Sequence, residues 1–410
     1  MRPAALGLLV AACTGQDAPT TPPPPAWKGG SVQAVALEDG GVAVLDVAWR
    51  ARTPVLSPDR IPAAATISLR RLDASGAVAW ESVLVEGERA AAHALALMPD
   101  GGLVALVTRP GTPSTTGLIR VEPGGRIAPF QTMGDAIVVR PRTLHVDATG
   151  RLHVGGSTAT PLHGTRQQPT PGALDGMAGF VARMTDTLEP EWVHMWEAEG
   201  DQAVADISGT GEILGFIGHS GPTGRRVTAP FLGRIAPDAP APTPIPDLHD
   251  AQALLWTAEG PIIAGWAATG PGSAGLPGST PLAPRIRALD EAGETRWETG
   301  GCCGTWAHRL DLQRTDDALF VGGRADAATL SLGALEAQGG AGVQAFVARL
   351  DPATGAVRSL AGLGKVGDTP LDLPNALLVG TARTACLVTA AGTPPLCPAD
   401  PASPEGQPPR

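Results

Sequence analysis

Cysteine is the residue type in this chain whose spacing most directly suggests covalent chemistry. Cys302 and Cys303 are adjacent, and Cys386 and Cys397 lie close to each other near the C-terminal end. We predict a disulfide bond between Cys386 and Cys397 and a second one within the adjacent pair. Because four cysteines allow three pairings, a bond from Cys302 or Cys303 to Cys386 is the alternative.

The fifth cysteine, Cys13, lies in a different setting. Arg2 precedes a short apolar run, which ends in the sequence Val10-Ala11-Ala12-Cys13. This run is much shorter than the roughly 18 residues of a membrane-spanning helix. An aliphatic residue and two small residues before a cysteine resemble the lipobox of bacterial lipoproteins, in which the thiol receives a diacylglycerol. The resemblance implies a signal peptide over residues 1–12 and a lipid on Cys13; the alternative is a cytosolic protein with a buried thiol.

The segment after Cys13 resembles a tether. Residues 13–30 contain the run Pro22-Pro23-Pro24-Pro25 and no apolar periodicity, which indicates a stiff, extended spacer. Thr14 follows the cysteine where an aspartate would signal inner-membrane retention in the enterobacterial sorting rule. We therefore expect a lipid-anchored protein of the bacterial cell envelope, at the outer membrane and facing the periplasm or the cell surface. Export also permits disulfide bonds.

The rest of the chain is organised as a repeat. Each unit has an apolar segment, a Gly or Asp turn and a second apolar strand, then a third strand, a tight turn and a fourth strand. The second strands are the clearest rows: residues 41–45, 102–106, 151–155, 212–216, 261–265, 318–322 and 385–389. Asp73, Asp290 and Asp351 begin turns that a glycine closes. Trp80, Trp192 and Trp297 follow on fourth strands, where a large ring can fill the gap between neighbouring sheets.

This pattern predicts an all-β fold, namely a β-propeller with four-stranded antiparallel blades over residues 31–397. The repeat period is roughly 50 to 65 residues. Six complete units precede a seventh with two strands, which predicts seven blades with an incomplete last blade. A six-bladed ring with an added hairpin is the alternative. We expect residues 398–410 to form a disordered tail.

Two units resemble a known repeat. Residues 330–355, with Ala345-Phe-Val-Ala-Arg-Leu-Asp351, and residues 168–192 are similar to the bacterial β-propeller repeat labelled SBBP. The resemblance implies a propeller, often exported as a lipoprotein, and assigns no activity. Residues 288–297 are more weakly similar to a PQQ-type repeat, which also occurs in an outer-membrane assembly lipoprotein.

Three polar residues fall on or near first strands, which line the central channel of a propeller. We predict that His93, Arg142 and His308 lie there and could bind a ligand, the alternative being a solvated channel lining. His145 and His153 lie on successive strands, and we interpret them as strand-surface residues rather than metal ligands.

Other motifs for chemistry are missing from the sequence. There is no tyrosine, which is the nucleophile of sialidase-like propellers, and no G-x-S-x-G motif. Asn375 is the single asparagine, whereas the calcium site of PQQ-dependent dehydrogenases uses one with acidic residues. We therefore predict no catalytic residue, no metal and no cofactor.

The net charge of −10, without a basic cluster, disfavours nucleic-acid binding. The sequence thus favours a monomeric, non-catalytic binding or scaffold module, anchored to the membrane by its lipid, with an envelope protein or a glycan as partner. The alternatives are a component of an envelope-assembly complex, or an oxidoreductase or hydrolase with an unrecognised site.

Overall fold

The computed structural model describes the strands of the repeat and most of their turns. The described residues are 28–29, 33–49, 65–74, 77–87, 90–135, 138–160, 162, 177–196, 201–210, 213–221, 229–235, 242–268, 282–302, 310–315, 317–325, 329–338, 343–367, 376–379 and 385–388. The predicted signal peptide, C-terminal tail and all but two residues of the tether lie outside them. Within these ranges there is no helix long and apolar enough to cross a membrane.

Six antiparallel sheets share a four-stranded arrangement, which we number as blades in chain order. Blade 1 contains β2 (Gln33–Ala36), β3 (Val42–Trp49), β4 (Ala65–Leu72) and β5 (Val78–Gly87), with β1 (Lys28–Gly29) also paired to β3. Blade 2 contains β6 (Ala91–Leu97), β7 (Leu103–Arg109), β8 (Thr115–Val121) and β9 (Gln131–Asp135). Blade 3 contains β10 (Val139–Val146), β11 (Leu152–Thr158), β12 (Ala178–Met184) and β13 (Pro190–Trp196).

The second half of the chain continues this order. Blade 4 contains β14 (Asp201–Thr210), β15 (Ile213–Gly221), β16 (Ala229–Ile235) and β17 (Thr243–Pro244). Blade 5 contains β18 (Asp250–Thr257), β19 (Gly260–Ala268), β20 (Leu282–Leu289) and β21 (Thr295–Cys302). Blade 6 contains β22 (Leu310–Arg314), β23 (Leu319–Ala325), β26 (Val343–Leu350) and β27 (Val357–Gly367). A last sheet contains β28 (Ala376–Val379) and β29 (Ala385–Val388).

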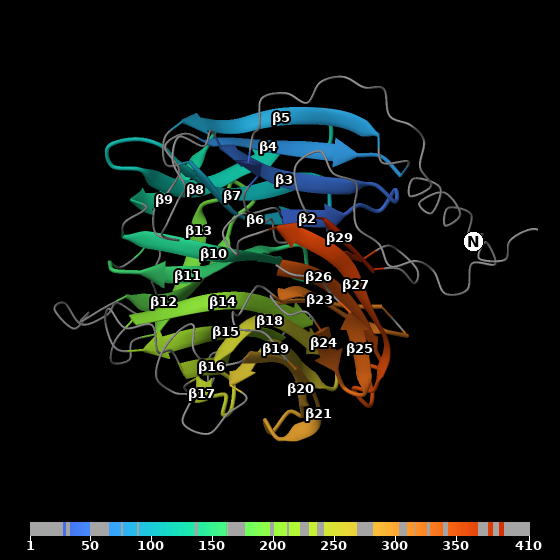
Figure 1. The fold of residues 1–410 in the computed structure, drawn as a ribbon. Coiled ribbons are helices and arrows are strands. Elements are labelled where there is room, and N and C mark those ends of the chain that lie inside the picture. The colour runs from blue at the N-terminus through green and yellow to red at the C-terminus, as the bar shows by residue number, and fades with distance from the viewer. Residues whose placement is uncertain are drawn as a thin grey trace, which may run out of the picture.

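The sheets form a closed ring around an axis. The innermost strands β2, β6, β10, β14, β18 and β22 contact one another in chain order, and β28 contacts both β22 and β2 (Figure 1). This arrangement confirms the predicted all-β propeller with four-stranded antiparallel blades. The two-stranded sheet between blades 6 and 1 is compatible with the predicted incomplete seventh blade.

Blade 5 has two further strands that come from blade 6. The chain between β23 and β26 forms the hairpin of β24 (Thr329–Leu332) and β25 (Leu335–Gln338). Strand β24 pairs antiparallel with β21, the outermost of the four blade 5 strands, so that this sheet has six strands. The hairpin therefore covers an edge of blade 5 while its covalent connections lie in blade 6.

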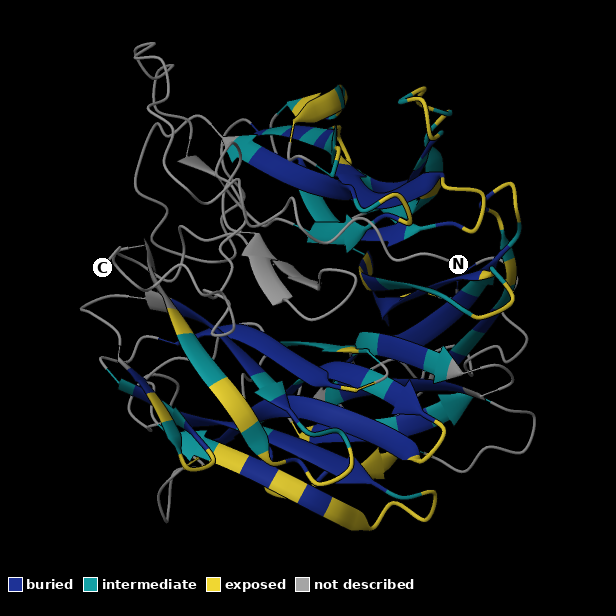
Figure 2. Cartoon of the chain, turned by 90° about the vertical axis from the view of Figure 1, so that its right-hand side faces the viewer, coloured by how far each residue is buried: buried dark blue, intermediate teal, exposed yellow. Residues whose placement is uncertain are grey.

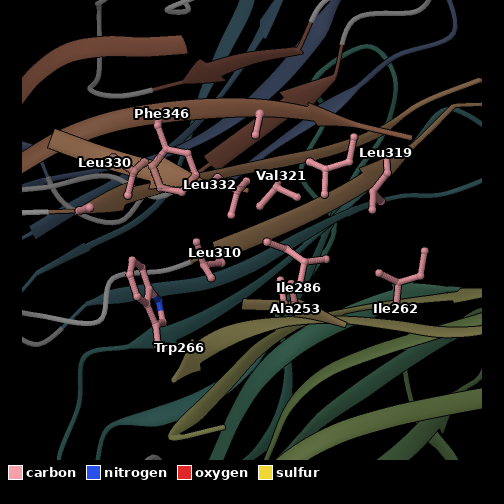
Figure 3. Close-up of a cluster of buried hydrophobic side chains, with 14 of the residues drawn as sticks. Ala253, Ile262, Trp266, Ile286, Leu310, Leu319, Val321, Leu330, Leu332 and Phe346 are labelled. Carbon is pink, nitrogen blue, oxygen red and sulfur yellow. The ribbon is translucent and has the colours of Figure 1, made fainter. Parts of the chain in front are cut away.

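The core lies between the blades. Inner strands such as β11 and β23 are buried along their whole length, whereas β5 alternates between more and less exposed residues. In Figure 2 strands that are buried along their length lie inside the molecule and strands with exposed residues lie at its outer edge. An inner strand is covered by a neighbouring sheet on both faces, and therefore its sequence is apolar without alternation. Figure 3 shows one such interface, where Trp266 and Ile286 of blade 5 face Leu310 and Phe346 of blade 6.

Two of the tryptophans predicted to fill gaps between blades do so at the rim. The indole Nε1 of Trp80 donates to the carbonyl of Pro123 at 3.0 Å, and that of Trp297 donates to the carbonyl of Pro352 at 3.2 Å. In both cases the acceptor lies in the turn between the third and fourth strands of the next blade. We call these two pairs the rim contacts.

Glycines make room for the rim contacts. A Cβ atom on Gly125 would lie 3.1 Å from the ring of Trp80, and one on Gly355 would lie 2.4 Å from the ring of Trp297. A hydroxyl two residues after each tryptophan adds a second bond: Ser82 donates to the Gly125 carbonyl at 3.0 Å, and Thr299 to the Gly355 carbonyl at 2.6 Å.

Candidate functional site

Four consecutive innermost strands carry an irregularity at the same register position. In β6, β10, β14 and β18 the pairing with the next strand shifts around a single residue, namely His93, Arg142, Ala205 and Gln252. Such a β-bulge leaves one residue unpaired and changes the direction of its side chain. The described part of β22 has no register shift. Three of the four bulged residues are polar and occupy the same end of the ring.

A second layer of polar residues lies behind the bulges, at the ends of the neighbouring strands. The ring Nε2 of His93 lies 2.8 Å from Thr108 Oγ1. Thr108 lies in turn 3.2 Å from the hydroxyl of Thr116, and both threonines are buried. These bonds fix the orientation of the His93 ring.

Asp250, at the start of blade 5, binds polar side chains of blades 4 and 5. Its Oδ1 lies 3.0 Å from Nε2 of His219, and its Oδ2 accepts a hydrogen bond of 2.6 Å from the Gln252 side-chain amide. The amide oxygen of Gln252 accepts a bond of 2.7 Å from the backbone N–H of Leu310 in blade 6. Both oxygens of Asp250 are therefore occupied by neighbouring side chains.

The charge of Arg142 acts on His93 and on His219, and the charge of Asp250 acts on Arg142. The positive charge of Arg142 lowers the pKa of both His93 and His219, in each case after the larger effect of burial. The negative charge of Asp250 opposes the lowering of the Arg142 pKa, which burial causes. We call His93, Thr108, Arg142, His219, Asp250 and Gln252 the axial cluster.

Of the basic residues in the axial cluster, Arg142 carries a permanent positive charge, whereas His93 does not. Burial and the charge of Arg142 lower the pKa of His93 to about 4, so His93 is neutral at neutral pH. Arg142 is partly exposed to solvent, while the surrounding protein and the charge of Arg140 lower its pKa. Within the described ranges, no hydrogen bond or ion pair joins its guanidinium to another residue. The cluster can therefore hold a polar ligand by charge and by hydrogen bonds.

Asp206, close to the cluster in β14, has a structural role. Its Oδ1 accepts from the Thr143 hydroxyl of blade 3 at 3.1 Å, and its Oδ2 accepts from the backbone N–H of Leu254 in blade 5 at 2.8 Å. One carboxylate thus joins the innermost strands of three blades, and this half-buried charge is stabilised by the donors that surround it.

His145 and His153, which we interpreted as strand-surface residues, are directly paired across β10 and β11. His153 bonds through Nε2 to Asp147 Oδ2 at 2.9 Å, and its ring lies 5.9 Å from the ring of Trp192. Among the described residues there is no group of three or more histidine, cysteine or acidic side chains that could hold a metal ion.

The other predicted site residues are placed in part. The structure brings His93 and Arg142 into one cluster, whereas His308 lies outside the described residues. Cys302 is at the end of β21 and is disulfide-bonded. Cys13, Cys303 and Cys397, like the side chain of Cys386 in β29, lie outside the described part, so the pairing stays a prediction.

The sequence interpretation missed His219, Asp250 and Gln252. An alignment of the units would have found Gln252, since it is the third residue of its strand, as His93 is, and Arg142 is the fourth residue of its own. His219 likewise occupies the position in β15 that Thr108 occupies in β7. These residues share a position in the repeat unit but differ in type, and therefore no sequence motif identifies them.

No family model matches the chain, and no curated protein matches it. Solved structures with a similar fold include a protein of unknown function from Dyadobacter fermentans, with a TM-score of 0.46 and 8% identity over 73% of this chain and 91% of that one. Another is the α-L-arabinofuranosidase of Fusarium graminearum, with a TM-score of 0.46 and 11% identity over 73% of this chain and 90% of that one.

A third is the β-propeller domain of the trilobed protease from Pyrococcus furiosus, with a TM-score of 0.45 and 9% identity over 91% of this chain and 93% of that one. These likenesses concern the fold, and at such identities they assign no substrate.

Our expectation that the chain is not an enzyme is corrected by these comparisons. Besides the arabinofuranosidase, the similar structures include a family-43 glycoside hydrolase and a sialidase, at 9% and 11% identity. The physical reason is that the residues at the axis can change while the blades stay the same, so one propeller scaffold accommodates active sites as well as binding sites. The missing sequence motifs therefore do not exclude catalysis.

Proposed function

We propose that this protein is an exported, lipid-anchored propeller of the bacterial cell envelope that binds a ligand at the axial cluster. The observation that carries the ligand site is the repeated bulge, which presents His93, Arg142 and Gln252 at one end of the axis. A bulge interrupts the ladder of backbone hydrogen bonds, and bulges are frequent where a side chain must be directed to a site.

The arrangement of the neighbours supports the same proposal. Asp250 and Thr108 hold the two histidines by side-chain bonds, so the polar groups of the cluster are oriented before a ligand arrives. A preorganised site loses less conformational entropy on binding than a mobile one. The ligand that we propose is a glycan or a segment of an envelope protein, and the proposal leaves open whether binding is followed by a reaction.

The ligand site is tested by filling it without removing any polar group. Ala205 occupies the bulge position in blade 4 beside the apolar cluster that includes Ile217 and Leu254, and Ala205→Trp adds a large ring there. Ala79→Trp, on the exposed strand β5, is the matched control. We expect glycans and peptides from the envelope that bind the wild type to bind Ala79→Trp equally and Ala205→Trp much more weakly. Equal binding by all three proteins, with unchanged circular dichroism, would place the ligand site elsewhere.

The anchor is tested separately. The sequence Val10-Ala11-Ala12-Cys13 and the proline run support it. In a bacterial host, a palmitate analogue should label the wild type and Cys303→Ser, but not Cys13→Ser, and Cys13→Ser should leave the membrane fraction. Labelling of Cys13→Ser at the wild-type level would refute the lipid anchor without affecting the ligand site.

A further inference from the structure

Arg142 differs from most arginines in the described part of the chain. Ion pairs with carboxylates hold these arginines: Arg70, Arg71, Arg120, Arg126, Arg183, Arg285, Arg287, Arg314, Arg349 and Arg358. Arg109 and Arg234 lie over aromatic rings instead. Arg142 has neither kind of partner among the described residues, although its charge acts on His93 and His219 and that of Asp250 acts on it.

No described carboxylate forms an ion pair with Arg142. Asp250 acts on Arg142 through space, yet its two oxygens are bonded to His219 and Gln252. The oxygens of Asp206 accept from Thr143 and from the backbone of blade 5. The cluster therefore contains N–H donors on Arg142 without a described acceptor, while the oxygens of Asp250 and Asp206 already accept bonds from other residues.

From this geometry we infer that the axial cluster binds the oxyanion group of a ligand, a carboxylate or a phosphate, through the guanidinium of Arg142. This inference rests on the proposed function and specifies the chemical class of its ligand. A guanidinium is planar and presents parallel N–H donors, which match the two oxygens of a carboxylate or a phosphate. Burial lowers the pKa of Arg142, and an anion held against the guanidinium would offset that unfavourable environment.

The neighbouring histidines leave the positive charge of the cluster to Arg142. The rings of His93 and His219 have lowered pKa values and favour the neutral form, so they do not add positive charge at neutral pH. Within the axial cluster, binding of the anion therefore depends on Arg142, whereas the side chains of His93 and Gln252 are bonded to Thr108 and to Asp250 and Leu310.

Three probes with a common sugar ring test the inference: glucuronate carries a carboxylate, glucose 6-phosphate carries a phosphate, and glucose carries neither. Binding to the folded domain is measured by calorimetry at low ionic strength. We expect one or both anions to bind more tightly than glucose. Arg142→Gln should weaken anion binding about tenfold or more, because a hydrogen bond to a charged group contributes roughly 1.5–3 kcal/mol.

Two further variants complete the test. Arg142→Lys keeps the charge but loses the planar fork, and we expect intermediate affinity. Arg151→Gln removes the same charge at the opposite end of blade 3, and we expect wild-type affinity. A preference for glucuronate identifies a carboxylate ligand, and a preference for glucose 6-phosphate identifies a phosphate ligand.

Other results would overturn the inference. These are equal binding of glucose and the anions, anion binding that Arg142→Gln leaves unchanged, and no binding of either anion at millimolar concentration. If a neutral ligand binds and Ala205→Trp blocks it while Arg142→Gln does not, the proposed ligand site stands and only its anionic character is wrong.

Discussion

The rim and the axis of the ring use the same repeat in different ways. At the rim, Trp80 and Trp297 make the same contact with the next blade. In both cases a glycine lies beneath the ring, and a hydroxyl two residues after the tryptophan donates to the carbonyl of that glycine. At the axis, the bulge position holds His93, Arg142, Ala205 and Gln252 in successive blades. Within one chain, a position that repeats its residue serves the contact between blades. A position that repeats its geometry but changes its residue is where we propose that a ligand binds.

The largest effect on stability should come from the rim. Trp297 is buried between blades 5 and 6, and we expect Trp297→Ala to lower the free energy of unfolding by about 3–5 kcal/mol, the usual cost of removing a buried aromatic side chain. Urea denaturation followed by circular dichroism measures it. Trp297→Phe, which keeps a ring but loses the N–H donor, should cost less. A loss below about 1 kcal/mol for Trp297→Ala would mean that this contact does not hold the two blades together.

A smaller loss is expected from the glycine under that ring. Gly355 has a φ of +70°, and an added Cβ would collide with Trp297, so Gly355→Ala combines backbone strain with overpacking. We expect a loss of about 2–4 kcal/mol in thermal or urea unfolding. Gly293→Ala is the matched control, since Gly293 has a φ of +87° but open space around its Cβ. Equal losses would show that only the backbone conformation matters.

His93 at the axis should contribute to the decrease of folding stability at acidic pH. His93 has a pKa of about 4 in the folded protein and an ordinary value of 6.5. The unfolded chain therefore binds a proton more readily between these values, and stability falls as the pH decreases from about 6.5 towards 4. His93→Gln should remove up to about 2 kcal/mol of this decrease. Urea unfolding at pH 7 and pH 4.5 measures it, and an unchanged difference between the two pH values would contradict the assignment.

The smallest effect on stability should come from Arg142. Because its guanidinium makes no bond to any residue that the structure describes, Arg142→Gln should change the free energy of unfolding by less than about 0.5 kcal/mol. The same substitution should have the largest effect on anion binding. A loss of stability comparable to that of Gly355→Ala would mean that Arg142 serves the fold, and the contrast between axis and rim would fail.

The repeating positions could be predicted from the sequence. The turns that begin at Asp73, Asp290 and Asp351 form as expected, with the aspartate oxygens accepting from backbone N–H groups. The second strands were found at the expected places because buried inner strands form continuous apolar runs. These features depend on residues close together in the chain, and local chemistry is visible in a sequence.

The axial cluster could be predicted only in part, because it depends on register and on contacts across blades. A bulge shifts the pairing by one residue and leaves the apolar pattern of the strand almost unchanged, so the sequence does not reveal it. His219 and Asp250 meet across the boundary between two blades, and nothing in either segment indicates the other. His93 and Arg142 were recognised because they are polar residues near the beginning of apolar strands.

The hairpin of β24 and β25 determines the order in which the ring can be completed. Blade 5 forms its first four strands from residues 250–302, but its last two strands lie after β23 of blade 6. A chain that emerges from its N-terminus must therefore leave the edge of blade 5 open until residue 338 is available. From then on the two blades are interlocked, since neither can separate without breaking a shared sheet. The second half of the ring should behave as one cooperative folding unit, in contrast to blades 2 and 3, each of which completes its sheet from one continuous segment.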